Sequence, residues 1–328
     1  MAKPVDKFKE LENLAQEKWA VLADGDKAWI RVGTALCGMA AGAPDVILAI
    51  KKWLKKKGVD ATVSQVGCLG LCFAEPLVDI KIPNQPRVVY GNVSPDDVPD
   101  LLDSQLLQQV ALERLVLGSV GGNIPGVASL AEHPMVKDQV RVALRNAGVI
   151  DPGDIYQYIA NGGYAGLRKA VIDMSPDDVI KEVQDSGLRG RGGAAFATGI
   201  KWSFLARSQN DKKYILCNCE EGDPGAFNDK GILESDPHTL IEGMLLAGYA
   251  TGANYGYVFI RHGHDGPIDR TRKAIEQARE HGLLGENILG SGFNFDAEVS
   301  LTGDSYVAGE ETALMESIEG KRSMPRFR

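Results

Sequence analysis

The stretch from Gly187 to Trp202 reads GLRGRGGAAFATGIKW and combines five glycines with three basic side chains. Glycine allows the backbone to adopt positive φ and to approach a ligand closely. Backbone N–H groups in such a loop form a concavity that binds anions, and the basic side chains add positive charge. The stretch has neither the GxxxxGK[ST] pattern nor the spacing of the dinucleotide-binding fingerprint. It predicts a loop that binds a phosphate-bearing cofactor, with a basic surface loop as the alternative interpretation.

The chain has 328 residues, of which 44% are apolar, and this is enough for two or three domains with cores of their own. Its net charge of −8 argues against nucleic acid as a partner. No apolar run reaches the roughly 18 residues that a membrane-spanning helix needs. The charged N-terminus differs from a secretory signal, and five cysteines in closely spaced pairs favour a reducing compartment. We therefore expect a cytoplasmic protein with no direct membrane span and no nucleic-acid partner.

The first hundred residues alternate between helical and extended patterns. Gly58 is expected to end one of the helices, and Ser94 is expected to cap another. The expected elements are an opening helix at 6–22, a strand at 28–32, a helix at 43–57, strands at 59–66, 77–82 and 87–90, and a helix from about 95. After the opening helix, this order of strands and helices predicts a small thioredoxin-like unit.

Three cysteines, Cys37, Cys68 and Cys72, follow the first two predicted strands, where loops can hold a metal. Clustered thiolates bind soft metals, and a [2Fe–2S] site of the ferredoxin type takes four of them. The residues ahead of Cys37 are Arg-Val-Gly-Thr at positions 31–34, and neither arginine nor valine ligates iron. The three cysteines are therefore either an incomplete cluster site or small buried thiols in a structural domain.

Residues 105–150 have a weaker pattern. The turn-rich stretch Gly118–Gly126 (GSVGGNIPG) predicts a linker, and residues 133–148 are expected to pack on the domain that follows. His133 at the start of that segment is expected to be a satisfied or exposed histidine and not a ligand.

From Asp151 onward helices and strands alternate regularly, which predicts a parallel or mixed sheet covered by helices. Ser175 is expected to cap one helix, with Pro176 at its first position, and that helix leads into the glycine-rich loop. The expected helices are 154–160, 164–171, 176–186, a helix after Lys201 that runs to Arg207, 237–251, 266–282 and 310–319, and the expected strands are 214–217, 255–260 and 295–300.

Polar side chains follow the strand at 214–217, in the sequence NCEEGDPG at 218–225. Acidic and amide groups at the carboxyl end of a strand are placed to contact ribose, flavin or nicotinamide, and a solvated turn is the alternative. A second such stretch, DSYVAGEET at 304–312, precedes the last helix. Cys217 and Cys219 are expected to point to opposite faces of the strand end and to have a structural role.

Three stretches together carry a family resemblance: GLRGRGGAAFATGIKW, NCEEGDPGAFNDK and YVAGEETALMESIEGKR. They resemble the NADH-binding flavoprotein subunit of respiratory complex I and its relatives in NAD-linked and electron-bifurcating hydrogenases and formate dehydrogenases. The N-terminal part, with Cys-x3-Cys at Cys68 and Cys72, resembles the thioredoxin-like [2Fe–2S] domain fused to many hydrogenase-type members. The implied fold class is α/β: a thioredoxin-like ferredoxin domain at 1–104, a linker and packing segment at 105–150, and an α/β FMN- and NADH-binding domain at 151–328.

The resemblance implies that FMN lies along the glycine loop and that NADH stacks on the flavin to deliver a hydride. It implies that Phe196 contacts the adenine side of NADH, and it assigns the catalytic positions to Glu311, near the nicotinamide, and Asp223. The other cofactor-binding residues that it implies are Gly190, Arg191, Gly192, Gly193 and Lys201 for the phosphate; Asn218, Glu220 and Glu221, with Asp223, for the flavin's polar edge; and Tyr306, Gly309 and Glu310, with Glu311, around the flavin. The metal ligands would be Cys37, Cys68 and Cys72, for a [2Fe–2S] cluster with only three cysteines.

The implied function is an electron-input subunit that transfers hydride from NADH to FMN and then single electrons to iron–sulfur clusters of partner subunits, in a dehydrogenase or hydrogenase complex. Ala195 and Ala197 stand where the family usually has glycine and proline, so Ala195 is expected in a backbone conformation that glycine adopts more cheaply. Family members continue past the position of Arg328 with ubiquitin-like and [4Fe–4S] domains, so a truncated or split member is expected. The alternative is a non-catalytic or assembly subunit that keeps the fold without stable FMN.

Overall fold

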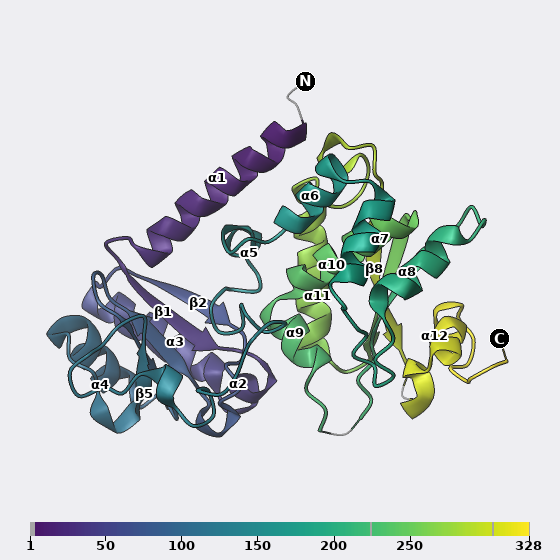
Figure 1. The fold of residues 1–328 in the computed structure, drawn as a ribbon. Coiled ribbons are helices and arrows are strands. Elements are labelled where there is room, and N and C mark those ends of the chain that lie inside the picture. Colours follow the sequence, from purple (N-terminus) through teal and green to yellow (C-terminus); the bar gives the residue numbers. More distant parts are fainter. Residues whose placement is uncertain (1–3, 224, 304, 328) are drawn as a thin grey trace. The chain divides into compact units, whose positions relative to one another are not determined.

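The computed structural model describes residues 4–223, 225–303 and 305–327 (Figure 1). The chain divides into two compact units. The N-terminal unit comprises Ala15–Gln157 together with Glu234–Asp236. The C-terminal unit takes in the start of the first helix as far as Leu14, then Tyr158–Leu233, and the chain from Pro237 on. The three-part division at residues 104 and 150 stays a prediction.

The N-terminal unit is built on a five-stranded mixed sheet with the order β2-β1-β3-β4-β5. β1 and β2 run parallel, and the other neighbouring pairs are antiparallel. The strands are β1 (Ala28–Gly33), β2 (Ala61–Val66), β3 (Val78–Lys81), β4 (Arg87–Tyr90) and β5 (Val116–Val120), and the α-helices are α1 (Pro4–Ala23), α2 (Leu36–Ala40), α3 (Ala43–Lys57) and α4 (Val98–Leu102). The predicted order of helices and strands through the first hundred residues is confirmed, with α2 as an added short helix.

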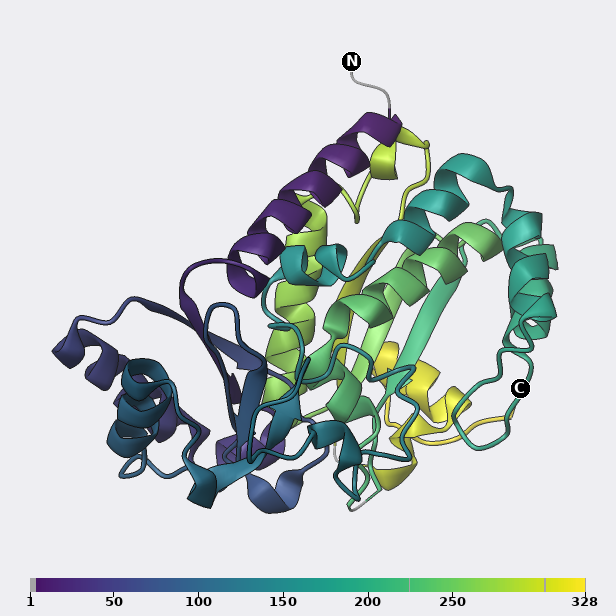
Figure 2. The same ribbon diagram turned by 60° about the vertical axis from the view of Figure 1, so that its left-hand side comes forward.

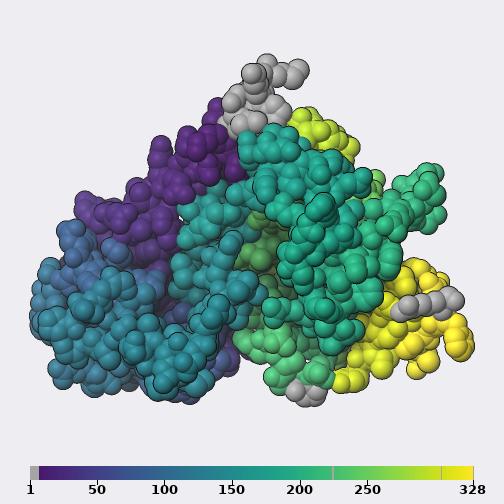
Figure 3. Space-filling model, in the orientation of Figure 1, coloured from purple at the N-terminus to yellow at the C-terminus, as the bar shows by residue number. Residues whose placement is uncertain are grey.

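The sheet of this unit packs on α3 and α4 around a buried apolar core that includes Ile30, Val46, Ile50, Ile80 and Leu101. α3 ends as predicted, because Gly58 adopts φ +67° and its N–H bonds to the carbonyl of Leu54. α1 is exposed over much of its length (Figure 3). Among its residues from position 7 on, Phe8 and Ala15 are the buried ones.

Two predictions for the N-terminal unit are wrong. The helix expected from about residue 95 begins at Val98, because the carboxylate of Asp97 accepts bonds from Ser94 N (2.9 Å) and Ser94 Oγ (2.6 Å) and closes a turn there. The expected linker at 118–126 overlaps β5, which pairs with β4. A Cβ atom on Gly118 would lie 2.7 Å from Leu130 N, so this glycine permits a close packing contact inside a strand.

The C-terminal unit contains a three-stranded parallel sheet with the order β6-β7-β8. Its strands are β6 (Tyr214–Cys219), β7 (Tyr255–Arg261) and β8 (Asp296–Thr302). The α-helices from here to the C-terminus are α5 (Ile155–Ala160), α6 (Ala165–Asp173), α7 (Pro176–Asp185), α8 (Thr198–Arg207), α9 (Asp229–Ser235), α10 (Pro237–Thr251), α11 (Asp265–Glu280) and α12 (Glu311–Ile318). The predicted α/β alternation with a parallel sheet is confirmed.

α10 and α11 pack against the sheet of the C-terminal unit, α10 on β6 and β7 and α11 on β8 (Figure 2). Small residues bring α10 close to the strands: a Cβ atom on Gly248 would lie 2.5 Å from the ring of Phe295. α7 begins with the predicted cap, because Ser175 Oγ accepts from Asp178 N while the Asp178 carboxylate accepts from Ser175 N. None of the described helices is long and apolar enough to cross a membrane.

Candidate functional site

The glycine-rich loop forms a small hairpin between α7 and α8. Gly190 N donates to Phe196 O at 2.8 Å, and Thr198 N donates to Leu188 O at 2.9 Å. The Arg189 guanidinium donates to Ala195 O at 3.1 Å and braces the same turn. The tip of the hairpin, residues 190–196, is exposed along its whole length. The sequence therefore builds a short loop whose backbone N–H groups remain accessible to a ligand.

The backbone at the tip requires glycine-like conformations. Gly193 adopts φ +94° and Ala195 adopts φ +50°, so the expectation for Ala195 is confirmed. A Cβ atom built on Gly192 or Gly193 would meet no described heavy atom within 4 Å. The glycines thus leave open space beside the loop, and this cradle fits a phosphate-bearing group.

The loop runs directly into the N-terminus of α8. Ala197 is the N-cap residue and provides no side-chain hydrogen bond, so the first N–H groups of the helix lack a side-chain cap. Such an N-terminus carries a partial positive charge and is suited to binding an anion. Lys201 lies in the first turn of α8 and is exposed, so it stands inside the helix and not ahead of it as predicted. Phe196 is also half exposed, with its ring 6.4 Å from that of Phe204.

A second group of predicted residues lies at the carboxyl end of β6. Asn218 Nδ2 donates to Gly309 O at 2.7 Å, and Tyr306 hydrogen-bonds with the Asp223 carboxylate. The buried carboxylate of Glu220 accepts from Gly222 N at 2.8 Å. Residues far apart in the sequence therefore meet at the edge of the sheet where β6 ends, as expected for a ligand site in an open parallel sheet. Position 304 in the second predicted stretch lies outside the described residues.

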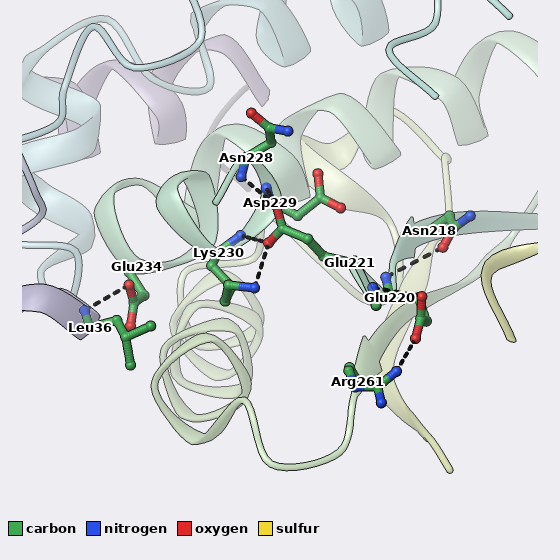
Figure 4. Close-up of polar contacts among 10 residues, drawn as sticks. Leu36, Asn218, Glu220, Glu221, Asn228, Asp229, Lys230, Glu234 and Arg261 are labelled. Carbon is green, nitrogen blue, oxygen red and sulfur yellow. Dashed lines mark hydrogen bonds and ion pairs between the residues drawn. The ribbon is translucent and has the colours of Figure 1, made fainter. Parts of the chain in front are cut away.

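Arg261 is a residue of this edge that the sequence analysis missed. It ends β7, and its guanidinium pairs with the Glu220 carboxylate at 2.7 Å (Figure 4). β6 and β7 are parallel neighbours, so a charged residue at the end of β7 lies beside one just after β6. The sequence pattern predicts no strand order, and the signal that could have identified Arg261 was its charge directly after the strand expected at 255–260.

The Glu221 carboxylate holds the beginning of α9 and does not line an open surface. It accepts hydrogen bonds from the backbone N–H groups of Asn228, Asp229 (2.9 Å) and Lys230 (2.9 Å), and it pairs with Lys230 Nζ at 3.3 Å (Figure 4). Burial acts to raise the pKa of Glu221, but these donors outweigh it and the pKa is lowered. The carboxylate is therefore fixed as an anion at a helix N-terminus.

Glu310 has the same kind of role one helix later. Its carboxylate accepts from Thr312 N and Ala313 N, both at 2.9 Å, and so caps α12. Glu311 is the first residue of α12 and its side chain is exposed. Both residues are exposed, and the described capping bonds at the start of α12 are made by Glu310.

Asp229 is a second residue that sequence reasoning missed. Burial raises its pKa to about 6, and the neighbouring Glu221 carboxylate adds to the effect. The signal available in the sequence was its position in the acidic stretch after β6, directly before Lys230, and in the structure it is the first residue of α9.

Cys217 and Cys219 do not point to opposite faces, and that expectation is wrong. Their Sγ atoms lie 3.7 Å apart near the end of β6. Residues two apart in a strand share a face, because side chains alternate with a period of two.

The three N-terminal cysteines come together within the N-terminal unit. Cys37 lies in α2, Cys68 follows β2, and Cys72 begins a 3-10 turn at Cys72–Ala74. Cys68 Sγ and Cys72 Sγ are 3.7 Å apart, and Gly70 N donates to Cys68 Sγ at 3.1 Å. Burial, followed by the hydrogen bond with Cys72, raises the pKa of Cys37 to about 11. Burial likewise raises the pKa of Cys68 to about 12.

Raised pKa values mean that these thiols stay protonated until a cation replaces the protons. The donor chemistry is that of a soft metal or an iron–sulfur cluster. Within the described ranges, no group of three or more His, Cys, Asp or Glu side chains is placed to hold a single metal ion. The two thiols at Cys68 and Cys72 fit a pair on one iron of a cluster, since about 3.8 Å separates two sulfurs that bind one metal tetrahedrally at about 2.3 Å.

Comparison with known proteins finds a family match in the C-terminal part of the chain. Residues 183–328 match the family described as the Nuo51 FMN-binding domain. The NADP-reducing hydrogenase subunit HndC of Solidesulfovibrio fructosivorans is 53% identical over 189 residues, which are 58% of this chain and 38% of that protein. An NADH-quinone oxidoreductase subunit of Escherichia coli is 44% identical over 171 residues, which are 52% of this chain and 38% of that protein. The chain thus matches well under half of the length of these curated relatives.

Solved structures give weaker likenesses. The NAD+-reducing [NiFe]-hydrogenase in its H2-reduced state is 21% identical with a TM-score of 0.48, and the match covers 98% of this chain and 53% of that chain. A thioredoxin-like [2Fe–2S] ferredoxin from Aquifex aeolicus is 21% identical with a TM-score of 0.26, and the match covers 31% of this chain and 98% of that chain. The family match supports the resemblance seen in the three sequence stretches, all of which lie within it. Residues 183–328 of this chain are therefore similar to the Nuo51 FMN-binding domain family.

Proposed function

We propose that this chain is an NADH-oxidising, FMN-dependent electron-input subunit. The observation that carries the proposal is the open glycine hairpin that runs into the uncapped N-terminus of α8, inside the stretch that matches an FMN-binding family. This geometry supplies backbone N–H groups, a helix dipole and the exposed Lys201 for a phosphate. The curated relatives match this chain over only 38% of their own length, so the activity given in their names is a proposal for this chain.

When bound, FMN would supply the redox chemistry, by accepting a hydride from NADH and releasing electrons one at a time. The protein's part is to hold and orient the ligands. In this proposal the loop residues Gly190, Arg191, Gly192 and Gly193 hold the phosphate with Lys201. Phe196 offers an exposed aromatic face to the adenine side of NADH.

The edge of the parallel sheet would hold the remaining polar groups. The Asn218 amide is held by its hydrogen bond to Gly309 O, and the Glu220 carboxylate is held by Arg261. In this proposal both side chains have fixed positions beside the flavin's polar edge. Glu221 and Glu310 contribute indirectly, because their carboxylates fix the starts of α9 and α12. Asp223, Tyr306 and Glu311 are exposed and are the side chains that we assign to the reacting end of the dinucleotide.

The N-terminal unit is assigned a [2Fe–2S] cluster on Cys37, Cys68 and Cys72. Its soft donors and their close spacing support this assignment. The partners would be NADH and the iron–sulfur subunits of a dehydrogenase or hydrogenase complex, in the cytoplasm.

The test is to bind FMN to the purified chain and to follow flavin fluorescence, and then to measure reduction of a dye with NADH and with NADPH. Quenched flavin fluorescence and nucleotide-dependent dye reduction are the expected results. A folded chain that binds no FMN would contradict the proposal and favour the non-catalytic or assembly role. Because one relative is named for NADP, the comparison of NADH with NADPH decides which nucleotide is the substrate.

A further inference from the structure

The side chain of Glu75 is a buried carboxylate whose hydrogen bonding is incomplete. It is 7% exposed, and it lies three residues after Cys72. Its Oε2 atom accepts from Leu77 N at 2.8 Å, whereas Oε1 has no hydrogen-bond partner among the described residues. A buried carboxylate oxygen without a donor is costly, so it indicates a missing partner.

The carboxylate of Glu75 faces the loop that follows β1. A Cβ atom on Gly33 would lie 3.1 and 3.2 Å from its two oxygens, and a Cβ atom on Gly38 would lie 3.1 Å from Oε2. These two glycines therefore leave the room that the carboxylate fills. The same carboxylate acts electrostatically on Cys37 and on Cys68, so it lies within range of both thiols.

A fourth cysteine ligand would be expected ahead of Cys37, at residues 31–34. The polar side chains there make contacts with other residues. Arg31 pairs with Asp79 at 2.9 Å and is buried. Thr34 Oγ1 lies 3.5 Å from the carbonyl oxygen of Val66. A second carboxylate, Glu234, accepts from Leu36 N at 3.0 Å beside Cys37 (Figure 4), which makes it the rival donor to be tested.

We propose that Glu75 supplies the fourth protein donor of the cluster site, through its Oε1 atom, together with Cys37, Cys68 and Cys72. A non-thiolate side chain can complete such a site, as the histidines of Rieske centres do. A carboxylate is a harder donor than a thiolate, so the cluster should be more labile and its electronic spectrum should differ from that of a four-thiolate site. This inference rests on the part of the proposed function that assigns a cluster to the N-terminal unit.

The experiment uses the full chain, loaded anaerobically with ferrous iron and sulfide and then desalted. Iron and sulfide per chain, visible absorption, and the EPR spectrum after dithionite reduction are measured for the wild type and for Glu75→Gln, Glu75→Cys, Glu234→Gln and Thr34→Val. Glu75→Gln should lose most of the iron. Glu75→Cys should retain it, with shifted absorption and EPR signals and slower loss in air. Glu234→Gln and Thr34→Val should match the wild type.

Glu75→Gln with wild-type iron content and spectra would overturn the inference, and so would loss of iron in Glu234→Gln or Thr34→Val alone. If Glu75→Gln does not fold, as judged by circular dichroism, Glu75→Cys decides, because an unshifted spectrum there excludes Glu75 from the site. A wild-type chain that takes up no iron would contradict both the assigned cluster and this inference. Iron in the wild type with no effect of either Glu75 substitution would contradict this inference alone.

Discussion

Arg31 and Asp79 form an ion pair inside the sheet of the N-terminal unit. They face each other across β1 and β3, their side chains are 1% and 6% exposed, and Arg31 also lies 4.1 Å above the ring of Trp29. The sequence pattern around Arg31 indicates only that this residue does not ligate iron. The structure shows why it is there: its guanidinium neutralises Asp79 and donates to Val149 O at 3.1 Å.

Removing one member of this pair should be strongly destabilising. Asp79→Ala would leave the Arg31 guanidinium buried without its counter-charge, which typically costs about 3–5 kcal/mol of unfolding free energy. Urea unfolding followed by circular dichroism measures this loss. Asp96→Ala, which removes an exposed carboxylate from the same unit, is the control and should change the unfolding free energy little. A loss for Asp79→Ala no larger than that of the control would show that the pair contributes nothing.

Asp229 gives the C-terminal unit a specific pH dependence. Its pKa in the folded state is raised to about 6, chiefly by burial and then by Glu221, so folding favours its protonated form. The contribution of this group to stability is therefore complete below its unfolded pKa of about 4, and it is lost as the pH rises through about 6. Asp229→Asn should remove this dependence and raise the stability at pH 7 by up to about 3 kcal/mol.

The measurement is the midpoint of urea unfolding between pH 4 and pH 8 for the wild type and for Asp229→Asn. The difference between the two proteins should grow over this range and become constant above about pH 7. A difference in unfolding midpoint that is the same at every pH would show that folding does not raise the pKa of Asp229. The backbone N–H of residue 229, which bonds to Glu221, is unaffected by the substitution.

α8 contributes to the candidate phosphate site through its N-terminus. The helix begins directly after the glycine hairpin, lacks a side-chain cap, and carries Lys201 in its first turn. Its other end carries Arg207, which is also exposed. One helix therefore offers two exposed positive charges, of which only the first stands beside the candidate phosphate site.

Lys201→Ala should weaken FMN binding because it removes a charge-assisted hydrogen bond to phosphate. Such a bond is worth about 1.5–3 kcal/mol, or roughly a 10- to 150-fold rise in Kd. Flavin fluorescence quenching measures the Kd. Arg207→Ala removes the same charge from the other end of α8 and should leave the Kd near that of the wild type. Equal Kd values for both variants would remove Lys201 from the site.

Elements with local signals were predictable from sequence, and elements decided by distant contacts were not. Ser175 and Pro176 set the start of α7, and Gly58 sets the end of α3, because caps act within a few residues. The glycines at 118–126 predict a turn, yet Gly118 lies in β5, where its close contact with Leu130 requires glycine. No local pattern contains that contact.

The same distinction holds for the candidate site. The glycine loop and the polar residues after β6 could be found from sequence, because their composition and position along the chain are local properties. Whether a carboxylate faces a ligand or the next helix was not predictable. Glu221 and Glu310 were expected at the flavin, and the structure uses both carboxylates to cap helices. Arg261 was missed because its partner Glu220 comes from another strand.

For the whole molecule, the division into two compact units has a thermodynamic consequence. The sheet of each unit is complete within that unit, and the N-terminal unit has its own apolar core. A ligand stabilises only the cooperative unit that binds it, by an amount set by its concentration relative to Kd. FMN at about 100 times its Kd should therefore add about 2.7 kcal/mol to the stability of the C-terminal unit and leave the N-terminal unit unchanged.

Differential scanning calorimetry of the full chain should show two transitions, and FMN should raise the midpoint of one of them. Asp79→Ala identifies the other transition, because this substitution acts inside the N-terminal unit. In that variant the transition that does not respond to FMN should move to lower temperature. A single transition that both FMN and Asp79→Ala shift would show that the two units unfold as one cooperative body. An Asp79→Ala effect on the FMN-sensitive transition alone would place flavin binding in the N-terminal unit, against the site proposed at the glycine loop.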